Sequence, residues 1–302
     1  MKEDVLGIGW DVGSWLGTRR ETLHCAALVA WRGTQARLFS LGRPVRFETP
    51  RDGEAPLKPM DIVRRVLGEP DAKGYFRTFS KVVVAVNAPL GFPSAFVRLA
   101  RGRRGVLTTP SSDIEHPMAY RETDRHVARL FGRRPLSTVF GSTGMQATLA
   151  LGYARAWQRD RGFALYPMDA GQAKKRIMVE VLPALLSTAE GRGRRKAEGD
   201  PIHPRIARLL PELSIGPGRR SLGFDAYLCA LMAVSLGVRE LGGSAMLPPI
   251  EGPPQGMSDR ILEREGWIYH VPPEWLNVEG KDSSPSAGNE RQRQPETGAR
   301  LS

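Results

Sequence analysis

Residues 81–93, KVVVAVNAPLGFP, combine a run of β-branched residues with an abrupt polar end. The four valines are typical of a strand that is covered on both faces of a sheet. Pro89 cannot continue the strand, so Asn87 stands at its carboxyl end. Because ligands bind outside the carboxyl ends of strands in open α/β sheets, we expect Asn87 at a binding crevice. Asparagine is also common before a proline-containing turn, so a capping role stays open.

The composition indicates a globular protein with a sizeable core, since 41% of the 302 residues are apolar. No run approaches the ~18 apolar residues of a membrane helix, and the N-terminus, MKEDVLGIGW, lacks the basic region of a signal peptide. We therefore expect a cytoplasmic protein without membrane association. Cys25 and Cys229 lack metal-site spacing and are predicted to be core thiols.

The net charge of +12 favours a polyanionic partner and so predicts nucleic-acid binding. Arginine clusters fall in three glycine-rich segments, residues 101–104, 192–196 and 219–220. Guanidinium groups on such segments suit bidentate phosphate contacts. Solvated loops, or an arginine-rich genome, would explain the same clusters.

The pattern along the chain predicts an α/β fold with one domain over residues 1–276. Strands are expected at 5–10, 25–31, 35–41, 81–87, 177–182 and 266–271, with a tight turn at 32–34. Helices are expected at 61–67, 94–100, 120–131, 145–159, 204–210 and 221–241. From residue 277 the sequence has almost no large apolar residue, so 277–302 is predicted to be a disordered tail.

Polar residues occupy comparable places in four of these elements: Asp11, Asn87, Glu180 and Asp225. Three are carboxylates, which repel one another unless a cation neutralises them. Oxygen ligands favour Mg²⁺ or Mn²⁺, and two such ions could promote phosphodiester hydrolysis.

Each residue also has a structural interpretation. Asp225 shares an apolar face with residues 228, 229 and 232, which points it toward the sheet, but it also suits the first turn of a helix. Asp11 could belong to an ordinary turn, and Glu180 could face solvent between Val179 and Val181. A further polar group consists of Arg121, Asp124 and Arg129. These residues could serve the site, or they could cap a helix and form surface ion pairs.

Six segments, in order, resemble the DUF429 family of predicted nucleases. They are residues 6–13 LGIGWDVG, 84–93 VAVNAPLGFP, 120–129 YRETDRHVAR, 179–183 VEVLP, 224–233 FDAYLCALMA and 265–272 EGWIYHVP. The resemblance implies a ribonuclease H-like sheet, with three antiparallel strands and then parallel strands flanked by helices. It also implies that Asp11, Asp124, Glu180 and Asp225 are the acidic site residues, and that Arg121 and Arg129 are their basic partners. Asn87 departs from the family pattern, which has aspartate there.

The leading hypothesis is a Mg²⁺-dependent nuclease in which Asp11, Glu180 and Asp225 hold the metal, Asp124 assists catalysis, and Asn87, Arg121 and Arg129 contact substrate. The alternative is an inactive ribonuclease H-like module that binds nucleic acid or protein. A third class is also considered, because residues 7–14 resemble the phosphate loop of sugar kinases and actin-like ATPases. The second glycine-rich motif that such enzymes need could only be residues 141–144, GSTG.

Overall fold

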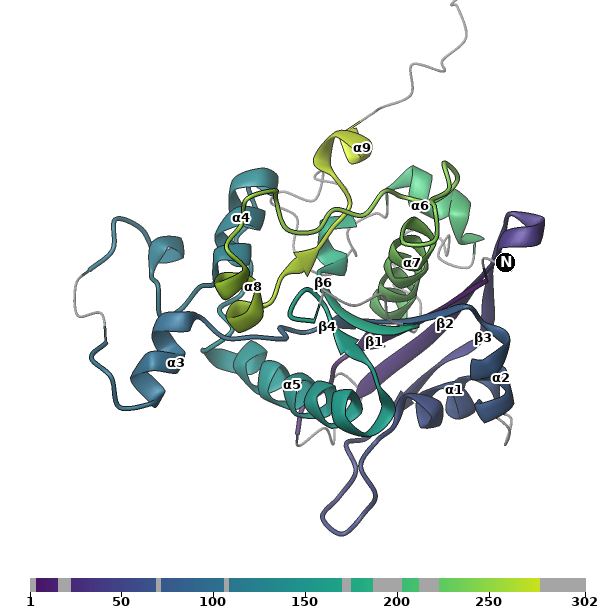
Figure 1. The fold of residues 1–302 in the computed structure, drawn as a ribbon, viewed down its shortest axis with the longest axis horizontal. Helices are drawn as coiled ribbons and strands as arrows, with labels where there is room; N and C mark the ends of the chain where they lie inside the picture. The colour runs from purple at the N-terminus through teal and green to yellow at the C-terminus, as the bar shows by residue number, and fades with distance from the viewer. Residues whose placement is uncertain are drawn as a thin grey trace, which may run out of the picture.

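A mixed sheet with helices on both faces builds this protein (Figure 1). The computed structural model describes residues 4–15, 23–68, 72–105, 109–169, 175–186, 203–211 and 223–277. In this part of the chain the sheet has seven strands, in the order β3-β2-β1-β4-β6-β5, with β7 also paired to β6. No helix within these ranges has the length and apolarity that a membrane span requires.

The first three strands form the expected antiparallel meander. β1 (Val5–Asp11) pairs with β2 (His24–Arg32), which pairs with β3 (Arg37–Phe47). The predicted tight turn is a single 3₁₀ turn, η2 (Gly33–Gln35), which ends at Ala36 in the left-handed region with φ 44°. The meander predicted from the sequence is therefore confirmed.

The other half of the sheet is parallel. β4 (Lys81–Asn87) lies beside β1, and β6 (Arg176–Val181) lies beside β4. Two short strands, β5 (Ala164–Leu165) and β7 (Ile268–Tyr269), both pair with β6. Three antiparallel strands followed by parallel ones confirm the predicted fold class, and the arrangement is compatible with a ribonuclease H-like sheet.

Every predicted helix is present; α3 has the predicted bounds, and the other helices differ from the prediction at one or both ends. Three helices were not predicted: α2, α8 and α9 are short, with five to seven residues each, and their sequences carry little apolar periodicity. Because α9 ends at Asn277, the predicted tail begins one residue too early, and the rest of it lies outside the described residues. The helices are α1 (Pro59–Leu67), α2 (Ala72–Thr78), α3 (Ser94–Ala100), α4 (Glu122–Phe131), α5 (Gly141–Arg161), α6 (Pro204–Leu209), α7 (Phe224–Arg239), α8 (Asp259–Glu265) and α9 (Pro273–Asn277).

The two faces of the sheet bury different helices. Figure 1 shows α7 on one side and α1, α2 and α5 on the other. Since successive side chains of a strand point to opposite faces, Val83 and Ala85 pack in the same core as α7. Val84 and Val86 pack with α1 and α5. This alternation also decides which face each polar residue at a strand end can reach.

Glycines in β1 let α7 lie directly against the strand. A Cβ on Gly9 would lie 1.8 Å from the carbonyl oxygen of Ala226, and one on Gly7 would lie 2.4 Å from that of Ala230. No larger residue fits at either place without moving the helix. The first turn of α7 is thereby held close to the carboxyl end of β1.

We predict that Gly9→Ala lowers the free energy of unfolding by ~1–3 kcal/mol or more, because the new methyl group overlaps the backbone of α7, which cannot easily move. Urea denaturation measures the change. The matched control is Gly152→Ala in α5, where no atom lies within 4 Å of the added Cβ. That control should gain ~0.5–1 kcal/mol from helix propensity. Equal stability of Gly9→Ala and the parent would contradict the close contact.

Candidate functional site

Neighbouring parallel strands place Asp11 and Asn87 side by side. The two residues are register partners at the carboxyl ends of β1 and β4. The Nδ2 of Asn87 donates a hydrogen bond to Oδ1 of Asp11, at 2.9 Å. Side chains two residues apart on a strand point to the same face of the sheet. Gly9 and Ala85, two residues before Asp11 and Asn87, face α7, so the pair lies on the α7 side.

Asp225 approaches the same edge from the first turn of α7. The residue after it, Ala226, is the one that meets Gly9 of β1. Burial, together with the charges of Asp11 and Asp225, raises the pKa of the Cys25 thiol to about 11. Burial and the same two carboxylates also raise the pKa of Cys229 well above its ordinary value. Asp11 and Asp225 therefore lie around the same two thiols, which are buried in the core as predicted.

Glu180 points to the opposite face of the sheet. Its register partner in β4 is Val86, and both Val86 and Met178 belong to the core under α1 and α5. The residue is 3% exposed, so the sequence-based interpretation that its side chain faces solvent is wrong. One of its oxygens accepts the backbone N–H of Leu90 at 2.9 Å.

Arg121, the residue before α4, holds Glu180 in a buried ion pair. Two hydrogen bonds of 2.6 Å join its Nη1 and Nη2 to the two carboxylate oxygens. Nε and Nη2 also bind Asp124, at 3.1 and 2.9 Å, and Nη1 reaches the carbonyl oxygen of Glu265 at 3.2 Å. All five N–H donors of the guanidinium are used.

The charges in this cluster act on one another. Burial alone would lower the pKa of Arg121, but Asp124 and Glu180 raise it above its ordinary value, so the guanidinium stays charged. Burial raises the pKa of Glu180, an effect that Arg121 partly offsets. The contacts of Arg121, Asp124 and Glu180 are thus those of a structural ion cluster.

The remaining residues of the predicted polar group have local partners. Asp124 also accepts the backbone N–H of Arg121 at 2.8 Å and so caps α4. Arg129 is two-thirds exposed and pairs with Glu122 at 3.0 Å. Capping and surface pairing, which the sequence left open, therefore account for both contacts.

The site offers a cation two carboxylates and an amide. Within the described residues, no three His, Cys, Asp or Glu side chains form a group that could hold a metal ion. The expected meeting of Asp11, Glu180 and Asp225 does not occur, because alternation along β6 turns Glu180 toward Arg121. Asp11, Asp225 and Asn87 are hard oxygen donors, and Mg²⁺ commonly binds one or two carboxylates while water and substrate oxygens complete its shell. Their donor chemistry matches that of one such ion and not that of a three-carboxylate cage.

A cavity of about 260 Å³ opens beside these residues. Its wall includes Asn87 and Asp225, and it also reaches Arg121 and Glu180. Thr143 and Gln146 line it from α5, and Gln146 donates to the carbonyl oxygen of Val12 at 2.8 Å. Sequence reasoning missed Gln146. Residues 141–144, the candidate for a second glycine-rich motif, form the first turn of α5.

His24, at the start of β2, fixes the loop after Asp11. Its Nδ1 accepts hydrogen bonds from the indole of Trp10 and from the backbone of Gly13, both at 3.0 Å. The ring's other nitrogen contacts Thr49, whose hydroxyl donates to the carbonyl oxygen of Ser14. Burial lowers the pKa of His24 to about 4, so the ring is neutral at pH 7 and suited to accept these bonds.

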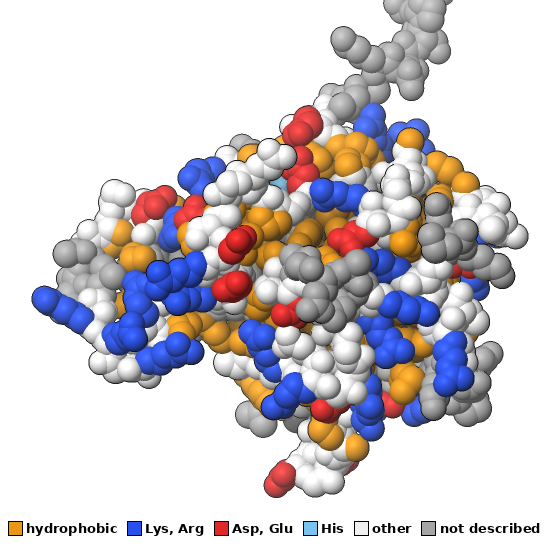
Figure 2. All heavy atoms as spheres, viewed as in Figure 1, with side chains coloured by type: hydrophobic (Ala, Val, Ile, Leu, Met, Phe, Trp, Pro, Cys, Tyr) orange, Lys and Arg blue, Asp and Glu red, His pale blue; other side chains and the backbone are white. Residues whose placement is uncertain are grey.

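One of the three arginine clusters can be placed. Arg101, Arg103 and Arg104 are exposed in the loop that follows α3. Figure 2 shows basic side chains gathered over α3 and this loop. The clusters at 192–196 and 219–220 lie outside the described residues.

Comparison with known proteins adds no further information. The chain matches no model of a protein family, no curated protein and no solved structure. The site must therefore be interpreted from its own geometry.

We predict that Arg121→Met lowers the free energy of unfolding by ~3–5 kcal/mol at pH 7, because it leaves Glu180 and Asp124 buried without a counter-charge. Burial already raises the pKa of Glu180, and in this variant Arg121 no longer offsets that effect. The stabilising contribution of the protonated Glu180 carboxyl is then present at low pH and is lost as pH rises, so the deficit should shrink on acidification. Urea denaturation at pH 7 and pH 5 measures both effects.

The matched control is Arg129→Met, which removes an exposed ion pair on the same helix. We expect it to cost less than ~1 kcal/mol at either pH. If Arg121→Met were as mild as this control, the cluster would not be a structural core.

Proposed function

We propose that this protein is a ribonuclease H-like nuclease that hydrolyses phosphodiester bonds of DNA or RNA with one bound Mg²⁺ or Mn²⁺. The observation that carries the proposal is the carboxyl edge of β1 and β4, where Asp11 bonds to Asn87 and where Asn87 and Asp225 line one cavity. Carboxylates at such an edge are placed to hold a cation against a phosphate.

Asp11 and Asp225 would hold the ion, and Asn87 would position Asp11 through its amide nitrogen while its amide oxygen is a third, uncharged donor. The ion would supply a Lewis acid for the phosphate and lower the pKa of a bound water. Gln146 and His24 keep the loop after Asp11 in place, through Val12 and Gly13. Glu180 has no metal role in this proposal, since Arg121 engages both of its oxygens.

The exposed arginines after α3 support a nucleic acid as the substrate. Arg101, Arg103 and Arg104 are unburied, and none forms an ion pair within the described residues. Free guanidinium groups can bind successive backbone phosphates without reading the sequence. The overall charge of +12 also favours binding of a nucleic acid.

We predict that Asp225→Asn abolishes Mg²⁺-dependent cleavage, tested on single-stranded DNA and RNA, duplexes and RNA–DNA hybrids. The loss should exceed ~100-fold, since even residues that only orient a metal ligand contribute ~10–100-fold. The control is Asp259→Asn, which changes an exposed aspartate in the first turn of α8. It should keep full activity. Unchanged cleavage by Asp225→Asn would contradict the proposal.

A second function, nucleic-acid binding without turnover, is favoured by the Asn87–Asp11 hydrogen bond. The amide nitrogen already stabilises the Asp11 carboxylate, as a cation otherwise would. The site then needs no metal to be stable. The protein would bind nucleic acid through its arginines and leave it intact.

Asn87→Asp separates the two functions. Without divalent ions it should lower the free energy of unfolding by ~1 kcal/mol, because two carboxylates then meet at the strand ends.

The response to Mg²⁺ decides between the functions. If the protein is a nuclease, Mg²⁺ should raise the melting temperature of the parent, and should raise that of Asn87→Asp by more. For a binding module only the variant should respond. Asn277→Asp, at an exposed asparagine, is the control, and no response in either protein would contradict a cation site at Asn87.

A further inference from the structure

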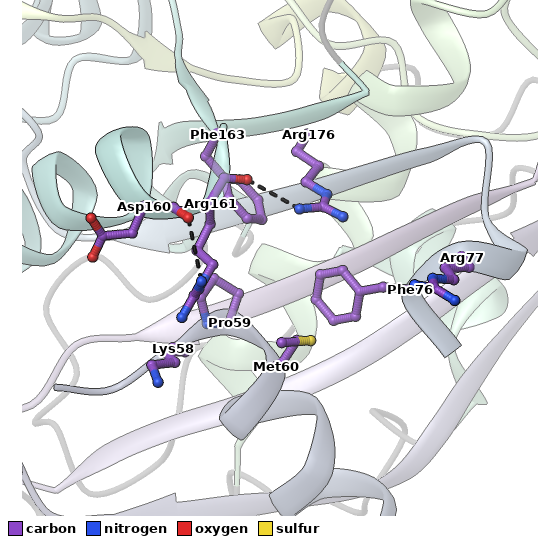
Figure 3. Close-up of a pocket in the computed structure, with 9 residues that line it drawn as sticks. All are labelled: Lys58, Pro59, Met60, Phe76, Arg77, Asp160, Arg161, Phe163 and Arg176. Carbon is purple, nitrogen blue, oxygen red and sulfur yellow. Dashed lines mark hydrogen bonds between the residues drawn. The ribbon is translucent and has the colours of Figure 1, made fainter. Parts of the chain in front are cut away.

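A second cavity, of about 290 Å³, lies at the opposite end of α5 from the candidate site. It is bounded by the C-terminal end of α5, the N-terminal end of α1, helix α2 and the first residue of β6 (Figure 3). Strand β6 begins here, at Arg176, whereas the candidate site lies where the parallel strands end. The two cavities share no lining residue.

The wall of this cavity is strongly basic. It carries Lys58, Arg77, Arg161 and Arg176 against a single acid, Asp160. Within the described part of the chain, none of these four cations forms an ion pair. Four positive groups facing a single acid repel one another and favour an anion between them.

Arg161 gives a specific reason to expect a ligand. Its Nε is buried and has no hydrogen-bond partner, while Nη1 makes only a long contact, 3.4 Å, to the carbonyl oxygen of Asp160. A buried donor left without an acceptor costs free energy. Arg176 lies across the cavity, oriented by a hydrogen bond to the carbonyl oxygen of Arg161 at 3.1 Å. Acceptor oxygens of a ligand at the Nη groups of Arg161 would engage the guanidinium that the protein leaves largely unpaired.

The rest of the wall is apolar and aromatic. Phe76 and Phe163 are 4% and 3% exposed, and Met60 lies beside Phe76. The guanidinium of Arg176 lies 5.9 Å from the centre of the Phe76 ring. A flat ring could pack against Phe76 and Met60 while an attached anion meets the arginines.

We propose that this cavity binds a nucleoside monophosphate, with its phosphate at Arg161 and Arg176 and its base against Phe76. Arginine pairs bind phosphate oxygens bidentately, and aromatic rings stack on any base. A volume of about 290 Å³ is at the lower end for small-molecule sites, which suits a mononucleotide better than a larger coenzyme. The ligand could be free or could be the phosphorylated end of an oligonucleotide.

The test is calorimetric titration of the full chain with AMP, GMP, CMP and UMP, with adenosine and inorganic phosphate alongside. We expect at least one nucleotide to bind ~10-fold more tightly than inorganic phosphate and adenosine. Arg161→Gln and Phe76→Leu should each weaken that binding by ~10-fold. The control is Arg159→Gln, which removes an exposed arginine of the same helix outside the cavity and should leave affinity unchanged.

A 5′-phosphorylated dinucleotide distinguishes the two sources. Tighter binding of the dinucleotide than of any mononucleotide assigns the site to an oligonucleotide end, and the reverse assigns it to a free nucleotide. The proposal is overturned if no nucleotide binds, if inorganic phosphate binds as tightly, or if Arg159→Gln weakens binding as much as Arg161→Gln. Melting temperatures verify that each variant folds.

If Phe76→Leu does not fold, NMR of the parent takes the place of that variant. Nucleotide should then shift the signals of the Arg161 and Arg176 Nε–H groups, and the absence of such shifts overturns the proposal.

Discussion

The contact between the backbones of β1 and α7 is the constraint on which the candidate site depends. Gly7 and Gly9 have no side chain on the face that α7 covers, so the helix can lie against the strand itself. Asp11 is two residues beyond Gly9, and Asp225 immediately precedes the residue that Gly9 meets. The distance between strand and helix therefore sets the position of both carboxylates, and the site forms only if this packing does.

The fold could be predicted largely from local pattern. The valine run of β4, the meander before it and the long apolar helix α7 each show a periodicity that belongs to one kind of element. The positions of the polar residues required more. Glu180 is the last residue but one of β6, whereas Asp11 is the last of β1. Glu180 faces the other side of the sheet, and this follows only from the register of β6 against β4. Strand order alone does not give that register.

Contacts between distant segments could not be predicted from local pattern. Arg121 and Glu180 are 59 residues apart. The family resemblance implied that Arg121 is a basic partner of the acidic residues, but neither flanking sequence shows that it would meet Glu180. The backbone N–H groups of Ser94 and Glu122 likewise bind the Glu265 side chain, which holds the start of α3 and of α4 together. The hydrophobic pattern predicts each of these elements, but it does not predict the polar contacts that join one element to another.

The two thiols around the candidate site have a practical consequence. A thiol reacts as the thiolate, and both Cys25 and Cys229 are buried with a pKa raised above the ordinary value. Thiol-alkylating reagents and mild oxidants should therefore leave both cysteines of the folded chain unmodified at pH 7. A cysteine introduced at an exposed position can carry a fluorophore or spin label without removal of either native one.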